Sequence, residues 1–480
     1  MRENTNAVCF LLFKCFLEVM PSKKTGKFAM AGVILALAWP TMLEQLMQTA
    51  VQYIDTAMVG VLGTDAVAAV GSTTSVNWLI GSSISAISIG FLSQIAQAFG
   101  AEDNGRAKRL SAQAVTVTFI VGLFFTALTL GLSSVVPALM QVDESIRVLS
   151  GQYFFILYTP MLFRTATTVF STVLRSAGDT KTPMKVGIAV NLTNIVLNFF
   201  FIYETRQVSL FGATFKVFGF GFGVLGAAAA SAIAFALGGI LLTIALFKHK
   251  EISPAKNSFK PDLKLLAPCF KISVPNFFQR FGTSLGYVVF AAMVNSVGPT
   301  AMAAHTVANT VESLFYIPGY GMQTAAATLA GNAYGAGDNK RLKSLCKMLI
   351  PIEIGLMIIS GAALFFTARP LVSLFSSSTE VINLGAVVLK MVALSEPFFG
   401  FTIVVEGMMQ GIGNTKPPFV YNILTMWGIR IVGTFICTQL LGLGLVSAWG
   451  CMVAHNLTLC ALFLISFISG RWNPMNKKAN

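Results

Sequence analysis

The chain has 480 residues, of which 55% are hydrophobic and 11% are charged, and its formal net charge is +14. Soluble domains carry about 25% charged residues, so this composition excludes an ordinary soluble enzyme or binding module. It predicts an all-α polytopic membrane protein, in line with a mean hydropathy of +0.73.

Twelve mostly apolar stretches are each long enough to cross roughly 30 Å of hydrocarbon as a helix. We expect a cytoplasmic leader at 1–28 and then an N-lobe at 29–248, with helices at 29–58, 66–98, 112–137, 150–174, 183–203 and 220–247. A polar cytoplasmic linker at 249–264 precedes a C-lobe at 265–470, with helices at 266–296, 301–330, 347–367, 382–410, 418–438 and 444–469. Residues 471–480 then form a cytoplasmic tail.

The two halves are copies of one unit, offset by 235 residues. Pro40 recurs as Pro275, and the stretch 100–108 recurs at 335–343 with six of its nine residues kept. Six helices per copy is an even number, so both copies insert the same way up. We therefore predict twelve transmembrane helices in two parallel six-helix repeats, a plan typical of transporters that alternate access to a central site.

The basic residues lie mainly on one side of this arrangement. The segments on the predicted cytoplasmic side hold 24 Lys and Arg, whereas the other loops hold Arg147, Arg206, Lys216 and Arg369. This is the positive-inside pattern, so the charge orients the protein and requires no nucleic acid. We predict a multi-pass protein of the cell membrane with both termini in the cytoplasm.

Polar residues on two helices of the N-lobe predict a cation site. Glu44, Gln48, Gln52 and Asp55 share one face of the first helix, because positions eleven apart are separated by only about 20°. On the fifth helix Asn191, Asn194 and Asn198 share a face in the same way. A carboxylate with amide oxygens suits Na⁺ or a proton; the alternative is that the asparagines only join helices, at about 0.6 kcal/mol per hydrogen bond.

The C-lobe does not repeat these residues. Position 290, the partner of Asp55, is Phe, and the partner of Glu44 is Gln279. Glu312 and Glu396 are candidates for coupling or substrate contact, whereas Glu353 and Glu406 lie nearer helix ends, where we expect them to reach the membrane surface. Four buried bases could pair with these acids as structural bridges: Arg164, Arg280, Lys390 and Arg430.

No cofactor is expected, and no metal beyond a possible Na⁺ at Asp55, because the seven cysteines show no metal-ligand spacing. The motifs that remain are Asp55-Thr56-Ala57-Met58-Val59-Gly60 followed by Leu62-Gly63, the stretch 175–183 and the stretch 411–418. In this order and spacing they resemble the multidrug and toxic compound extrusion (MATE) family of cation-coupled antiporters, over about residues 30 to 470.

The resemblance implies two six-helix bundles around a V-shaped central cavity and the export of amphiphilic, often cationic, organic compounds in exchange for Na⁺ or H⁺. It also implies that Asp55 and Asn194 belong to the cation site of the N-lobe. Two departures stand out: Asn198 occupies a place where many members carry aspartate, and segment 276–293 lacks an acid found in one sodium-coupled branch.

We therefore expect a monomeric antiporter for drug-like compounds, without enzymatic activity. A flippase for lipid-linked oligosaccharides or other lipids is the alternative, although pyrophosphate substrates favour a more basic cavity. A membrane prenyl transferase would need acid clusters of the DDxxD kind, which the chain lacks. A channel is possible in principle, but duplicated lobes suit alternating access better.

Overall fold

The computed structural model describes residues 27–140, 142–210 and 213–478, so the predicted leader lies outside it apart from its last two residues. The helices of the N-terminal half are α2 (Lys27–Gly60), α3 (Thr64–Gly100), α4 (Asn104–Gly131), α5 (Val136–Leu139), α6 (Glu144–Tyr158), α7 (Met161–Ser176), α8 (Lys181–Phe201) and α9 (Gly223–Lys248). Those of the C-terminal half are α10 (Leu263–Val297), α11 (Pro299–Gly335), α12 (Asn339–Phe375), α13 (Thr379–Ala393), α14 (Glu396–Gly411), α15 (Lys416–Thr425), η1 (Met426–Ile431), α16 (Val432–Phe435), η2 (Ile436–Leu440), α17 (Leu445–Ile468) and η3 (Pro474–Lys478).

These helices make twelve spans, six in each half, and confirm the predicted fold class. Eight described helices are long and apolar enough to cross a membrane, and the pair α13–α14, bent by 52°, makes nine. The remaining three spans, α6–α7, α10 and α11, are helical over comparable lengths but carry more polar residues.

Two of the predicted spans, 150–174 and 382–410, each consist of two helices. The first breaks between Tyr158 and Met161, and the second between Ala393 and Glu396. Pro160 caps α7, and Pro397 lies in the first turn of α14. Proline lacks the backbone N–H that a continuing helix needs. Each break therefore lies next to a proline, and a new helix begins there.

An antiparallel hairpin, β1 (Glu204–Leu210) with β2 (Ala213–Phe220), joins α8 to α9 and was not predicted. The corresponding connection in the C-terminal half covers only residues 441–444. We call the end of the bundle that carries this hairpin the hairpin end, and the end that carries the 249–262 connection the linker end.

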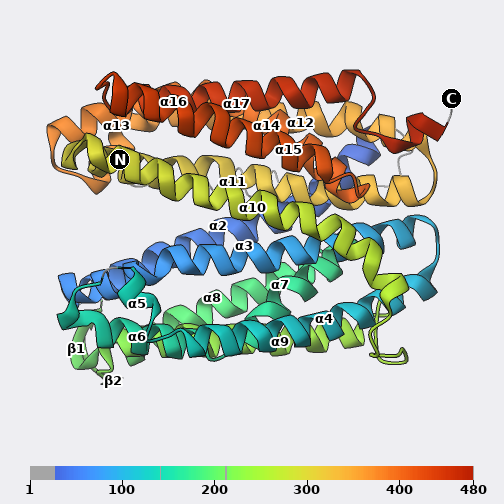
Figure 1. Ribbon diagram of the computed structural model, residues 1–480. Coiled ribbons are helices and arrows are strands. Elements are labelled where there is room, and N and C mark those ends of the chain that lie inside the picture. Colours follow the sequence, from blue (N-terminus) through green and yellow to red (C-terminus); the bar gives the residue numbers. More distant parts are fainter. Residues whose placement is uncertain (1–26, 141, 211–212, 479–480) are drawn as a thin grey trace.

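The two halves form two lobes, and one long helix from each crosses into the other (Figure 1). Ile34 and Ala38 of α2 lie in a C-lobe core with residues of α11, α12, α14 and α17, whereas Val59 at the far end of α2 lies in the N-lobe core. The helix α10 does the reverse: Cys269 lies in the N-lobe core and Phe290 in the C-lobe core. Each lobe is therefore completed by a segment of the other repeat.

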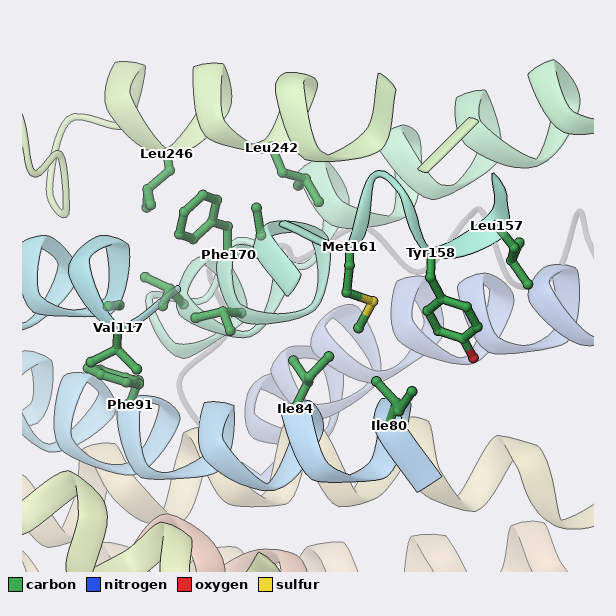
Figure 2. Packing of buried hydrophobic residues seen from close by; sticks show 14 of the residues in the cluster. Ile80, Ile84, Phe91, Val117, Leu157, Tyr158, Met161, Phe170, Leu242 and Leu246 are labelled. Atoms are coloured by element: carbon green, nitrogen blue, oxygen red, sulfur yellow. The ribbon is translucent and has the colours of Figure 1, made fainter. Parts of the chain in front are cut away.

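Five helices of the N-terminal half supply most of the N-lobe core. Figure 2 shows how aliphatic and aromatic residues of α3, α4, α6, α7 and α9 interlock. Its labelled members are Ile80, Ile84, Phe91, Val117, Leu157, Tyr158, Met161, Phe170, Leu242 and Leu246. Of these helices, α9 packs most extensively against α8, and the other main neighbour of α8 is α2.

Backbone contacts at the linker end join the lobes with the symmetry of the repeat. A Cβ atom at Gly100 would overlap the carbonyl oxygen of Asn332, and a Cβ at Gly335 would overlap that of Gln97. Gly335 is the repeat partner of Gly100, and Asn332 is the partner of Gln97. Both glycines therefore allow a backbone approach that any larger residue would prevent.

Side chains reinforce this contact from both lobes. Ser93 donates to the Gly411 carbonyl at 2.8 Å, and Gln97 donates to the same oxygen at 3.0 Å. Thr328, the partner of Ser93, donates to the Arg175 carbonyl at 3.4 Å. The linker end is thus held by a repeated set of interlobe contacts, and Figure 1 shows the two sets of ribbons spreading apart toward the hairpin end.

Candidate cation site

A carboxylate of α2 meets an amide of α8 inside the N-lobe. Asn198 Nδ2 donates to Asp55 Oδ1 at 2.6 Å and lies 3.2 Å from Asn194 Oδ1. Asn198 is completely buried, and its Oδ1 atom has no hydrogen-bond partner among the described residues. The carboxylate itself is partly buried. The structure therefore brings together three of the residues that the sequence proposed.

Asn194 connects this pair to α9. Its side chain contacts Ser231 Oγ at 3.0 Å. With its amide turned over, Asn194 donates to both Asp55 oxygens, at 2.8 and 3.2 Å, while its oxygen accepts from Ser231. Ser231 was not proposed from the sequence, because a lone serine among alanines gives no signal until α8 and α9 are placed side by side.

The other candidates of the two polar stripes lie apart from this cluster. Asn191 is buried one turn from Asn194, and its Nδ2 has no partner among the described residues. Gln48 and Gln52 are exposed on α2. These three residues share the predicted faces but make no hydrogen bond to Asp55 within the described chain.

Glu44 does not join the cation site. It forms an ion pair with Arg175 of α7, with 2.6 Å between Oε2 and Nη2, and both side chains are largely buried. Eleven residues of helix separate Glu44 from Asp55 by about 16 Å along the axis. Facing the same side of a helix therefore did not place the two carboxylates in one site.

The C-lobe has different side chains at the positions equivalent to the Glu44–Arg175 ion pair. Gln279 and Gln410, the repeat partners of Glu44 and Arg175, each donate to Glu406 Oε1 at 2.9 Å. Asn422 donates to Glu406 Oε2 at 3.3 Å. A carboxylate held by three neutral amides thus replaces an ion pair.

The prediction that Glu353 and Glu406 reach the membrane surface is wrong. Glu406 is buried by these amides, and Glu353 is fully buried with neither carboxyl oxygen bonded among the described residues. Neither side chain reaches the membrane surface as predicted. Gly319 and Gly400 of the neighbouring helices pack directly against the Glu353 side chain. These contacts hold the carboxyl group between helices, away from the membrane surface.

Glu312 and Glu396 are both buried inside the C-lobe. Glu396 begins α14, and its Oε2 atom has no hydrogen-bond partner in the described part of the chain. Glu396 interacts electrostatically with Glu312 and Glu353, so three acids share one interior. They lie in the other lobe from Asp55.

The four bases predicted to be buried form no ion pairs among the described residues, and only Arg430 is buried, since Arg164 and Arg280 are half-buried and Lys390 is exposed. Arg164 lies over the rings of Tyr158 and Phe235, and Lys390 lies over Phe365. Arg430 lies over Phe290 and Tyr287, and Arg280 donates to Asn276. The ion pairs found among the described residues are Glu44–Arg175 and Glu144–Arg147.

The cluster around Asp55 offers one negative charge and several neutral oxygens. Such a set is suited to a small monovalent cation or a proton, because the carboxylate supplies the charge and the amide and hydroxyl oxygens replace water. Within the described residues no group of three His, Cys, Asp or Glu side chains could hold a metal ion.

Comparison with known proteins gives consistent matches. The MatE family model matches residues 40–200 and 275–436, one segment in each repeat. A probable multidrug resistance protein NorM of Thermotoga maritima is 28% identical over 440 residues, covering 92% of each chain. A probable multidrug resistance protein YoeA of Bacillus subtilis is 27% identical, covering 90% of this chain and 92% of its own.

Solved structures share the fold. A MOP superfamily transporter from Pyrococcus furiosus superposes with a TM-score of 0.85 at 22% identity, over 93% of this chain and 97% of the other. An outward-facing multidrug resistance MATE family transporter also gives 0.85 at 22% identity, over 93% and 96%.

Proposed function

The chain belongs to the MatE family of transporters, and from this premise we propose that it exports amphiphilic, often cationic, organic compounds in exchange for Na⁺ or H⁺. Asp55 receives the incoming cation, with Asn194, Asn198 and Ser231 as neutral partners. The single observation that carries the proposal is the 2.6 Å contact between the Asp55 carboxylate and the Asn198 amide, with no base paired to Asp55 among the described residues.

The same helix connects the site to the opposite lobe. Tyr53, two residues from Asp55, donates its hydroxyl to the Thr310 carbonyl of α11 at 3.2 Å. The start of α2 also lies in the C-lobe core. A change in how α2 packs on α8 when a cation binds would therefore alter contacts between the lobes, which supports coupling of cation binding to the two-state equilibrium of the transporter.

The orientation of the protein in the membrane is inferred from its charges. The linker end carries most of the Lys and Arg residues, so we assign it to the cytoplasm. The repeated glycine contacts would then close the cytoplasmic side while the hairpin end faces outward. One cation moving inward yields about 2.3 kcal/mol per 100 mV, enough for roughly a fiftyfold gradient of a neutral compound at about 1.4 kcal/mol per tenfold.

The test uses purified protein in liposomes loaded with ethidium, with sodium and proton gradients imposed separately. Asp55→Asn should abolish cation-driven ethidium movement and leave a folded protein. Asp65→Asn, which changes an exposed carboxylate at the start of α3, serves as the matched control and should transport normally. Undiminished transport by Asp55→Asn would refute the proposal, and transport that responds to neither gradient would favour the flippase alternative.

A further inference from the structure

The repeat shows what stands in the C-lobe where the N-lobe has its cation site. Phe290 is the partner of Asp55, Ile429 is the partner of Asn194, and Gly433 is the partner of Asn198. The carboxylate and both amides are therefore absent from the equivalent place.

A positive side chain occupies that place instead. Arg430 directly follows Ile429, within the π-helical segment η1. Its guanidinium carbon lies 4.3 Å from the centre of the Phe290 ring and 4.8 Å from that of Tyr287. A π-helical turn contains an extra residue, which changes the face that the following side chains present. The outcome is that a guanidinium rests on the ring that replaces Asp55.

This arginine is held differently from the buried arginine of the N-lobe. Arg175 contacts Glu44 directly at 2.6 Å. Arg430 is only 4% exposed, its Nε atom has no hydrogen-bond partner among the described residues, and no described carboxylate forms an ion pair with it. Glu312 of α11, Glu353 and Glu396 are buried in the same lobe without an ion pair to it. The C-lobe interior thus contains a fixed cation and three buried acids that do not contact it as ion pairs.

Two histidines complete the surroundings. The His305 ring lies 5.5 Å from the Phe290 ring and 5.9 Å from Trp449, and His455 lies on α17, which packs against η1. In the described residues both histidine Nδ1 atoms are buried and unbonded. Neither histidine carries a negative charge that could pair with Arg430.

We propose that Arg430 is a tethered cation that fills the C-lobe counterpart of the Asp55 site and so confines exchangeable cation binding to the N-lobe. The proposal rests on the function assigned above to Asp55. Its physical basis is that like charges repel strongly in a poorly solvated interior, so the fixed guanidinium disfavours a second cation at the buried acids of the C-lobe. Transport then uses one cation site per chain.

The test counts cations bound by the purified full-length protein in detergent, as radioactive sodium retained plus the difference in proton uptake between matched variants. Arg430→Gln should bind one cation more than the unsubstituted protein, because the guanidinium no longer repels a cation from Glu312. The double variant Arg430→Gln with Glu312→Gln should return to the original count. A folded Arg430→Gln protein with an unchanged count would overturn the proposal.

A second pair of variants covers the case in which Arg430→Gln does not fold. Phe290→Asp places a carboxylate under Arg430 and should bind no additional cation, since the two side chains pair. If Phe290→Asp gains a cation while Arg430 is present, the tethered cation is not effective and the proposal fails. Asp55→Asn in each background tests the N-lobe site separately and should lower the number of bound cations by one. A number that does not change would contradict the Asp55 site but not the role of Arg430.

Discussion

One turn beyond Pro40 of α2, the N-lobe has Glu44 paired with Arg175, whereas the C-lobe, one turn beyond the equivalent Pro275 of α10, has Gln279 and Gln410 bound to Glu406. Both arrangements fix the crossing helix, α2 or α10, to its own lobe. The glycine contacts at the linker end are instead the same in both lobes. A glycine at a backbone contact between lobes can hardly be substituted. A buried polar pair, in contrast, can be replaced by other side chains that supply the necessary hydrogen-bond donors and acceptors.

The largest effect is expected from breaking the ion pair. Glu44→Gln leaves Arg175 largely buried without its partner, and loss of one member of a buried pair costs about 3–5 kcal/mol. The double variant Glu44→Gln with Arg175→Gln copies the two glutamines of the C-lobe and should recover part of this stability. Thermal unfolding in detergent measures both. A double variant less stable than Glu44→Gln would show that the lobes are not interchangeable here.

Removing the amide that contacts Asp55 should come next. Asn198→Ala removes a neutral oxygen partner of the bound cation in the proposed site, so the cation concentration for half-maximal transport should rise, by about tenfold for each 1.4 kcal/mol of binding free energy lost. Asn422→Ala removes one of three amides around Glu406 in the C-lobe and is the matched control. Equal effects of the two substitutions on cation dependence would contradict a site confined to the N-lobe.

The glycine contacts provide a symmetric test. Gly100→Ala and Gly335→Ala each place a Cβ against a carbonyl oxygen of the other lobe, and overpacking of this kind costs about 1–3 kcal/mol. Both should weaken closure of the linker end and expose Cys269, which is buried there against Gly90. Labelling of Cys269 by an impermeant thiol reagent in inverted vesicles measures this.

Gly131→Ala is the control for this labelling, because the added Cβ meets no atom within 4 Å. Enhanced labelling with only one of the two interface variants would show that the repeat symmetry does not extend to the mechanics of closure.

The smallest effect is expected at the Tyr53–Thr310 hydrogen bond, which has no equivalent in the other repeat. Tyr53→Phe removes the hydroxyl that reaches Thr310, a bond worth about 0.5–1.5 kcal/mol. Its repeat partner is Val288, which is exposed and makes no such bond. We expect transport to slow by roughly two- to tenfold with cation binding unchanged; weaker cation binding instead would place Tyr53 in the site itself.

Several of these features could be predicted from sequence and others could not. The twelve spans and the repeat follow from hydropathy and from copied residues, and the convergence of Asp55 with Asn194 and Asn198 agrees with two polar faces on adjacent helices. Helix periodicity fixes the direction of a side chain but not its partner, so Glu44 was grouped with Asp55 although Arg175 binds it. Ser231 and the π-helical placement of Arg430 depend on three-dimensional packing that no local pattern shows.

The exchange of helix segments between lobes also has a consequence for the order in which the protein folds. Ile34 and Ala38 belong to a core whose other members include Phe401 and Phe463, so residues made at the start of synthesis must wait for partners made near its end. Contacts of such high sequence separation form late and slowly. Until α11, α12, α14 and α17 are made, the beginning of α2 has no completed core to enter, so these contacts can form only after the C-lobe helices.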